Sequence, residues 1–66
     1  MKRKIKTINL SDIQELDEVE ILATGERAIV VDVPVIPGQD SYMLEIIGKN
    51  EMPLFYTRKE FKFIKR

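Results

Sequence analysis

Hydrophobic and polar residues alternate along several short runs of the chain, as they do in β-strands that bury one face. In residues 18–23, every second position from Val19 onward is valine, isoleucine or alanine. Gly25 then offers the backbone freedom of a tight corner, and a second apolar run follows in residues 27–33. These two runs predict a β-hairpin. Because the letters AIVV contain no polar break, the second strand is expected either to be central in a sheet or to carry a bulge.

Three further strands are predicted downstream, in residues 42–47, 54–57 and 61–64. The loop over residues 34–40 contains two prolines and a Pro-Gly dipeptide, which end strand pairing. Residues 58–60 are expected to form a single 3₁₀ turn before the last strand. Five short strands with regularly spaced turn signals predict a small barrel or rolled sheet.

The start of the chain carries weaker structural signals. The β-favouring residues in positions 4–9 predict a strand there. Ser11 can cap one helical turn over residues 12–15, in which case Ile13 and Leu16 face the core. The apolar positions are too few for a longer helix, so we expect at most short helical turns.

The length and the cysteine count limit the class of protein. We expect a single domain over residues 1–66, with residues 1–10 as either a mobile basic arm or an extra edge strand. The chain has no cysteine, and small secreted domains usually need disulfides, so the expected location is cytoplasmic. No apolar run is long enough for a signal peptide or a membrane span, so no membrane association is expected.

The residue types exclude most catalytic chemistry. Histidine and cysteine are absent, so Ser11 and Ser41 lack an imidazole to activate them, and no thiolate can attack a substrate or hold zinc. Residues 12–20 are rich in carboxylates, but they lack the spacing and the glycine of an EF-hand. Glu18 and Glu20 fit a solvated strand face better than an acid–base pair. We expect no enzymatic activity, no cofactor and no bound metal.

Charge is balanced overall but uneven along the chain. Eleven basic and eleven acidic residues give a formal net charge of zero, which argues against a general polyanion binder. Nine of the basic residues lie near the two ends: Lys2, Arg3, Lys4, Lys6, Arg58, Lys59, Lys62, Lys65 and Arg66. Because chain ends often lie close together in a small domain, these residues can merge into one positive patch beside the acidic residues 12–20.

The strings VEILATGERAIVVDV, DSYMLEI and PLFYTRKEFKFI resemble the small SH3-like barrels, which include KOW-type modules and short proteins of phages and mobile elements. The resemblance covers residues 16–64 and rests on core and turn positions: Val19, Ile21, Gly25, Ala28, Val30, Tyr42, Leu44, Phe61 and Ile64. It implies an all-β fold, a five-stranded SH3-like barrel with a short turn into the closing strand. KOW modules usually carry glycine where this chain has Ala28. The resemblance specifies a packing pattern and leaves the function open.

Two functions from different classes are predicted. The first is a non-catalytic interaction module, a protein-binding accessory protein of a bacterium, phage or mobile element, with the contact residues Val35, Ile36, Phe55 and Tyr56. Phe55 and Tyr56 are neighbours in a strand, so their side chains are expected to face opposite sides. The alternative is a nucleic-acid-binding barrel that uses the nine basic residues near the ends. A homo-oligomer is a third option, since so small a core gains from association.

Overall fold

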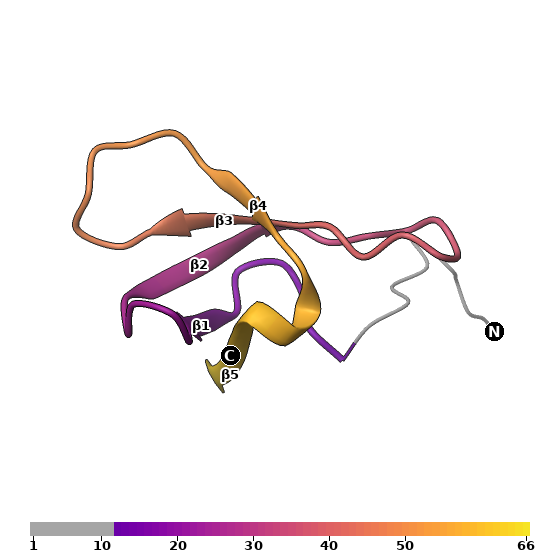
Figure 1. The fold of residues 1–66 in the computed structure, drawn as a ribbon, viewed down its shortest axis with the longest axis horizontal. Coiled ribbons are helices and arrows are strands. Elements are labelled where there is room, and N and C mark those ends of the chain that lie inside the picture. Colours follow the sequence, from indigo (N-terminus) through magenta and orange to yellow (C-terminus); the bar gives the residue numbers. More distant parts are fainter. Residues whose placement is uncertain (1–11) are drawn as a thin grey trace, which may run out of the picture.

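The computed structural model describes residues 12–66, so the predicted strand over residues 4–9, the predicted basic arm and the cap at Ser11 lie outside the described part. Within it, five antiparallel strands form one sheet with a single 3₁₀ turn, which confirms the all-β class (Figure 1). The elements are β1 (Glu18–Ile21), β2 (Arg27–Asp32), β3 (Tyr42–Ile46), β4 (Leu54–Tyr56), the 3₁₀ turn η1 (Arg58–Glu60) and β5 (Phe61–Lys65). Each of the five strands predicted over these residues is present, with its ends shifted by at most two residues.

The strands are ordered β4-β3-β2-β1-β5, and every neighbouring pair is antiparallel. Strands β1 to β4 form a meander, after which η1 leads the chain back to place β5 beside β1. In the described part β4 and β5 do not pair, so the sheet is not closed into the predicted barrel and both strands are edges. β4 is only three residues long and η1 follows it closely, so the chain offers a short ladder at this edge.

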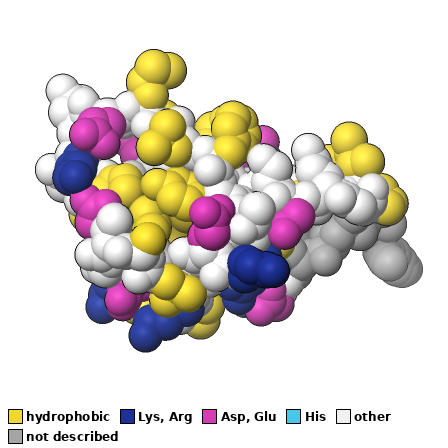
Figure 2. Space-filling view, in the orientation of Figure 1, with side chains coloured by type: hydrophobic (Ala, Val, Ile, Leu, Met, Phe, Trp, Pro, Cys, Tyr) yellow, Lys and Arg dark blue, Asp and Glu magenta, His cyan; other side chains and the backbone are white. Residues whose placement is uncertain are grey.

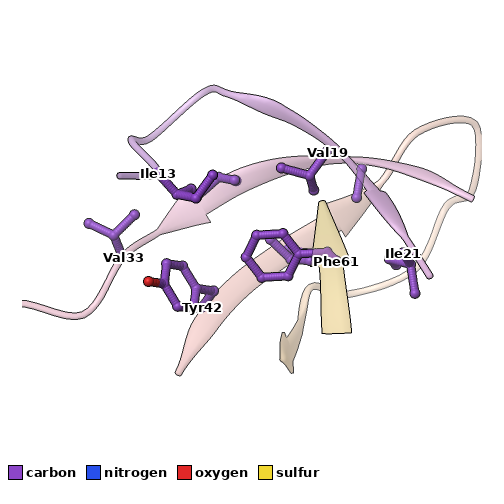
Figure 3. Packing of buried hydrophobic residues seen from close by; sticks show 9 residues of the cluster. Ile13, Val19, Ile21, Val33, Tyr42 and Phe61 are labelled. Atoms are coloured by element: carbon purple, nitrogen blue, oxygen red, sulfur yellow. The ribbon is translucent and has the colours of Figure 1, made fainter. Parts of the chain in front are cut away.

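The inward-facing residues of the strands build one small core (Figure 3). Its buried side chains are Ile13, Val19, Ile21, Ala28, Val30, Val33, Tyr42, Leu44 and Phe61. The rings of Tyr42 and Phe61 meet edge to face, with centroids 5.2 Å apart and planes at 74°, an arrangement that aromatic pairs favour. In β1, β2 and β3 the buried residues alternate with less buried ones, as the sequence pattern predicts.

The β1–β2 hairpin shows why its strands end where they do. The carbonyl of Ile21 accepts the N–H of Gly25 at 2.7 Å, which starts the corner two residues earlier than predicted. Gly25 adopts a φ of +78°, in the left-handed region that favours glycine. β2 lies in the middle of the sheet, and its pairing with β3 shifts register between Val30 and Asp32. The AIVV strand is therefore both central and bulged.

The segment before β1 does not form the predicted helical turn. Ile13 is buried as expected, but Leu16 is 76% exposed, so the prediction that it faces the core is wrong. The N–H of Asp17 donates to the carbonyl of Gln14 at 3.1 Å, and Leu16, with a φ of +76°, is the third residue of this β-turn. The N–H of Leu16 donates to the carbonyl of Val30 at 2.8 Å, while the N–H of Val30 donates to the backbone carbonyl of Asp17 at 2.9 Å. Two residues thus oppose one, as in a G1 bulge, and Asp17 takes the inward position.

Candidate protein-binding surface

The loop between β2 and β3 holds two of the predicted contact residues, Val35 and Ile36. It extends away from the sheet, and its end lies well apart from β4 (Figure 1). The carbonyl of Ile36 accepts the N–H of Gln39 at 3.0 Å, and Gly38 has a φ of +87°, so Pro37 and Gly38 are the central residues of a β-turn. Val35 and Ile36 are both exposed on this loop.

The other two predicted contact residues, Phe55 and Tyr56, lie in β4 and face opposite sides of the sheet, as predicted. Phe55 is 66% exposed and is paired with Met43 of β3. Tyr56 is half-buried and packs against the core. The structure therefore brings Phe55 together with Met43, and the four predicted contact residues do not form one continuous surface.

Three large apolar side chains are exposed in β4 and just before it: Met52 by 84%, Leu54 by 54% and Phe55 by 66%. We call these three residues the β4 edge surface. Leu54 lies opposite Leu44 of β3, on the inner face, but stays exposed because no strand of the described residues continues the sheet beyond β4. Figure 2 shows hydrophobic side chains gathered between the β3–β4 connection and the β1–β2 corner. The sequence predicted a strand here, but its alternation alone could not show that Leu54 would lie at an edge.

The two edges of the sheet are protected differently. On β5, Lys62 and Lys65 are exposed, and charged side chains on an edge strand, lysine above all, discourage pairing with another chain. β4 carries no charged residue, and within the described part its backbone pairs only with β3. An edge strand points every second N–H and C=O away from the sheet. β4 therefore offers free backbone groups together with apolar side chains on both faces.

Two of the predicted nucleic-acid contacts, Arg58 and Arg66, are engaged within the molecule. Arg58 donates to both carboxylate oxygens of Asp12 at 3.2 Å and to the carbonyl of Phe61 at 2.9 Å. Arg66 donates to both carboxylate oxygens of Asp17, at 2.9 and 3.0 Å. The two arginines thus tie the segment before β1 to the last turn and strand.

The lysines of the same region are less constrained. Lys59, Lys62 and Lys65 form no ion pair with another described residue. Lys62 and Lys65 are nevertheless opposite Glu20 and Glu18 in the β1–β5 ladder, so acidic neighbours offset their charge. The remaining predicted contacts lie outside the described residues: Lys2, Arg3, Lys4 and Lys6. The predicted convergence of the two basic segments lies outside them as well.

Asp17 is the buried charged residue of the described part. Besides the bonds from Arg66, its carboxylate accepts the N–H of Gln14 at 2.9 Å. The hydrogen bond from the guanidinium of Arg66 lowers the pKa of Asp17 below its usual value, against the opposing effect of burial. One of the acidic residues 12–20, Asp17, is therefore internal, and its hydrogen bonds join the segment before β1 to Arg66.

The described residues contain no group of three histidines, cysteines or carboxylates placed to hold a metal ion. Nor do they include a helix with the length and apolar character needed to cross a membrane. In comparisons with known proteins, no family model, curated protein or solved structure matches the chain. What the protein does must therefore be inferred from its own residues.

Proposed function

We propose that this protein is a non-catalytic, protein-binding module with an SH3-like fold, of the kind found among accessory proteins of bacteria, phages and mobile elements. The resemblance implies a short turn into a closing strand, and the path from η1 into β5 beside β1 supports it. The lack of histidine and cysteine supports a role without catalysis.

One observation carries the binding proposal: β4 is an uncharged edge strand with exposed apolar side chains on both faces. An extended segment that pairs with β4 would cover Leu54 on the inner face and Phe55 on the outer face in the same step, because alternate residues of a strand lie on alternate faces. Full burial of a leucine or phenylalanine side chain contributes about 1.5–3 kcal/mol. The proposed ligand is an extended, apolar protein segment that binds by strand addition.

Nucleic-acid binding is the alternative function, and the lysines that form no ion pair with another described residue favour it. Lys59, Lys62 and Lys65 are all exposed and lie within seven positions of one another in η1 and β5. Binding through their contacts with phosphates would weaken steeply as salt increases, whereas strand addition through apolar side chains would not. The glutamates opposite Lys62 and Lys65 make this the weaker proposal.

Peptides selected from a displayed random library on the immobilised protein test strand addition. The tightest peptide is synthesised, labelled and titrated by fluorescence anisotropy. Phe55→Lys should abolish binding, because a lysine on an edge strand opposes pairing. The matched variant Ile36→Lys places the same charge on an exposed apolar residue of the β2–β3 loop and should leave the affinity unchanged. Equal affinities of Phe55→Lys and wild type would overturn the proposal.

Labelled single-stranded DNA, duplex DNA and RNA, titrated at low and at physiological salt, test the alternative. Salt-sensitive binding that is lost in the double variant Lys59→Glu/Lys62→Glu would support a nucleic-acid interface. No binding at low salt would exclude it.

A further inference from the structure

We propose that the occupant of the β4 edge is a second copy of this chain, whose own β4 pairs with it antiparallel about a twofold axis. This inference rests on the proposed function, because it requires that β4 accept an added strand. An interface between identical copies must be self-complementary, so each residue that contacts its symmetry partner has to fit a copy of the same surface.

The residues of β4 meet that condition when the axis passes beside Phe55. Antiparallel pairing then sets Leu54 of one copy opposite Tyr56 of the other, and this pair occurs twice by symmetry. The two Phe55 side chains lie opposite each other on the outer face, and each is already next to Met43 of its own β3. Aromatic and aliphatic cross-strand pairs of this kind stabilise sheets. No charged side chain lies between Met52 and Thr57, so the strands bring no like charges together.

Charges at the two ends of β4 are complementary. Glu51 precedes the strand and Lys59 follows it, and both are exposed. Antiparallel pairing places the end that carries Glu51 beside the partner's end that carries Lys59, so opposite charges approach twice in each dimer. Among the described residues Glu51 and Lys59 have no ion pair. Lys49, the nearest basic residue on the same loop, is paired with Glu26 at 2.6 Å; that hydrogen bond, and to a lesser extent the charge of Glu51, raise the pKa of Lys49.

The length of β4 sets the strength of this dimer. Only three residues on each copy can pair, since Pro53 offers no N–H and Thr57 is the N-cap of η1. Interfaces this small are at the weak end of specific association. The dimer is therefore expected to form and dissociate reversibly, with a dissociation constant in the micromolar range or weaker.

Sedimentation velocity of the full chain from about 10 μM to 1 mM tests the pairing at low salt. The sedimentation coefficient of the wild type should rise with concentration. Glu51→Lys and Lys59→Glu should each weaken the dimer about tenfold, because each dimer contains two such pairs, and the double variant should restore it. Glu45→Lys, an exposed charge reversal on β3, is the matched control and should behave as wild type. Circular dichroism checks that all variants are folded.

The outcomes separate this inference from the proposed function. A wild type that stays monomeric at 1 mM, but binds the selected peptide in a Phe55-dependent manner, would refute the dimer and leave the strand-addition site intact. A dimer that the double charge reversal fails to restore would refute the antiparallel arrangement. Dimerisation that the selected peptide reverses would support both, because one edge cannot pair with two strands at once. If the protein forms no dimer and also shows no Phe55-dependent peptide binding, both proposals are overturned.

Discussion

Replacement of Asp17 by alanine tests how the segment before β1 is held against the sheet. Its carboxylate is fully buried and accepts three hydrogen bonds, at 2.9 Å from the N–H of Gln14 and at 2.9 and 3.0 Å from Arg66. A hydrogen bond to a charged group contributes about 1.5–3 kcal/mol. The contributions of the three hydrogen bonds do not add in full, because the guanidinium of Arg66 is half exposed and can form hydrogen bonds with water in the variant. We expect Asp17→Ala to lower the free energy of unfolding by about 2–3 kcal/mol.

This loss is large for so small a domain. At roughly 0.05–0.15 kcal/mol per residue, the whole protein is stabilised by about 3–10 kcal/mol. Urea unfolding followed by far-UV circular dichroism measures the change directly. Glu15→Ala removes an exposed carboxylate from the same β-turn and should stay within about 0.5 kcal/mol of wild type. If Asp17→Ala also stays within that limit, the inference that this carboxylate anchors the segment is wrong.

The same carboxylate predicts a pH dependence. Its pKa in the folded protein lies below the unfolded value of about 3.9, so its contribution is complete above that value and is lost as the pH falls through the folded pKa. The stability difference between wild type and Asp17→Ala should therefore be constant from pH 7 to about pH 5 and should narrow below about pH 4. A difference that persists unchanged at pH 2 would contradict the assignment.

Three further variants test the core and two of the left-handed positions by the same urea assay. Leu44→Ala removes a fully buried side chain from β3 and should cost about 2–5 kcal/mol, whereas a value near zero would mean that Leu44 is not in the core. Gly25→Ala should cost about 1–2 kcal/mol from the backbone alone, since no atom lies within 4 Å of the added Cβ; a neutral result would argue against its φ of +78°. Leu16→Gly should stabilise the protein by about 0.5–1 kcal/mol, and a loss of stability would show that the leucine packs more than its exposure indicates.

The strands could be predicted because their pattern is local. Val19 and Ile21 alternate with glutamates, and Gly25 supplies the left-handed corner that the hairpin needs, so the first two strands follow from neighbouring residues. The bulge in β2 follows similarly from the run AIVV, which is too long and too apolar for one buried face. Closure of the sheet depends instead on whether β4 and β5, its two opposite edges, pair with each other, and no local pattern reports that contact.

The exposed residues of the β4 edge surface, where we propose binding, were predicted less well for the same reason. Phe55 was found because an aromatic neighbour of Tyr56 must face the other side of its strand. The exposure of Leu54 was not predicted, since it arises because no described strand pairs with the outer edge of β4, and not from its own position in the alternation. The contacts of Arg58 and Arg66 with acids about 50 positions away are equally invisible in sequence, where these residues look like a free basic end.

Leu16 is the place in the described chain where conformation and residue type disagree. It is the one residue there other than glycine with a positive φ, and its side chain is 76% exposed. The G1 bulge that it occupies normally takes glycine. Packing in the core does not explain a leucine at this point, and its hydrocarbon side chain forms no hydrogen bond. Because the buried Ile13 and the hydrogen bonds of Asp17 hold the residues on both sides of the turn, Leu16 keeps its left-handed backbone conformation at a cost of about 1–2 kcal/mol. A stabilised Leu16→Gly protein would mean that this conformational cost is real, because glycine adopts a positive φ without the steric penalty that a Cβ brings.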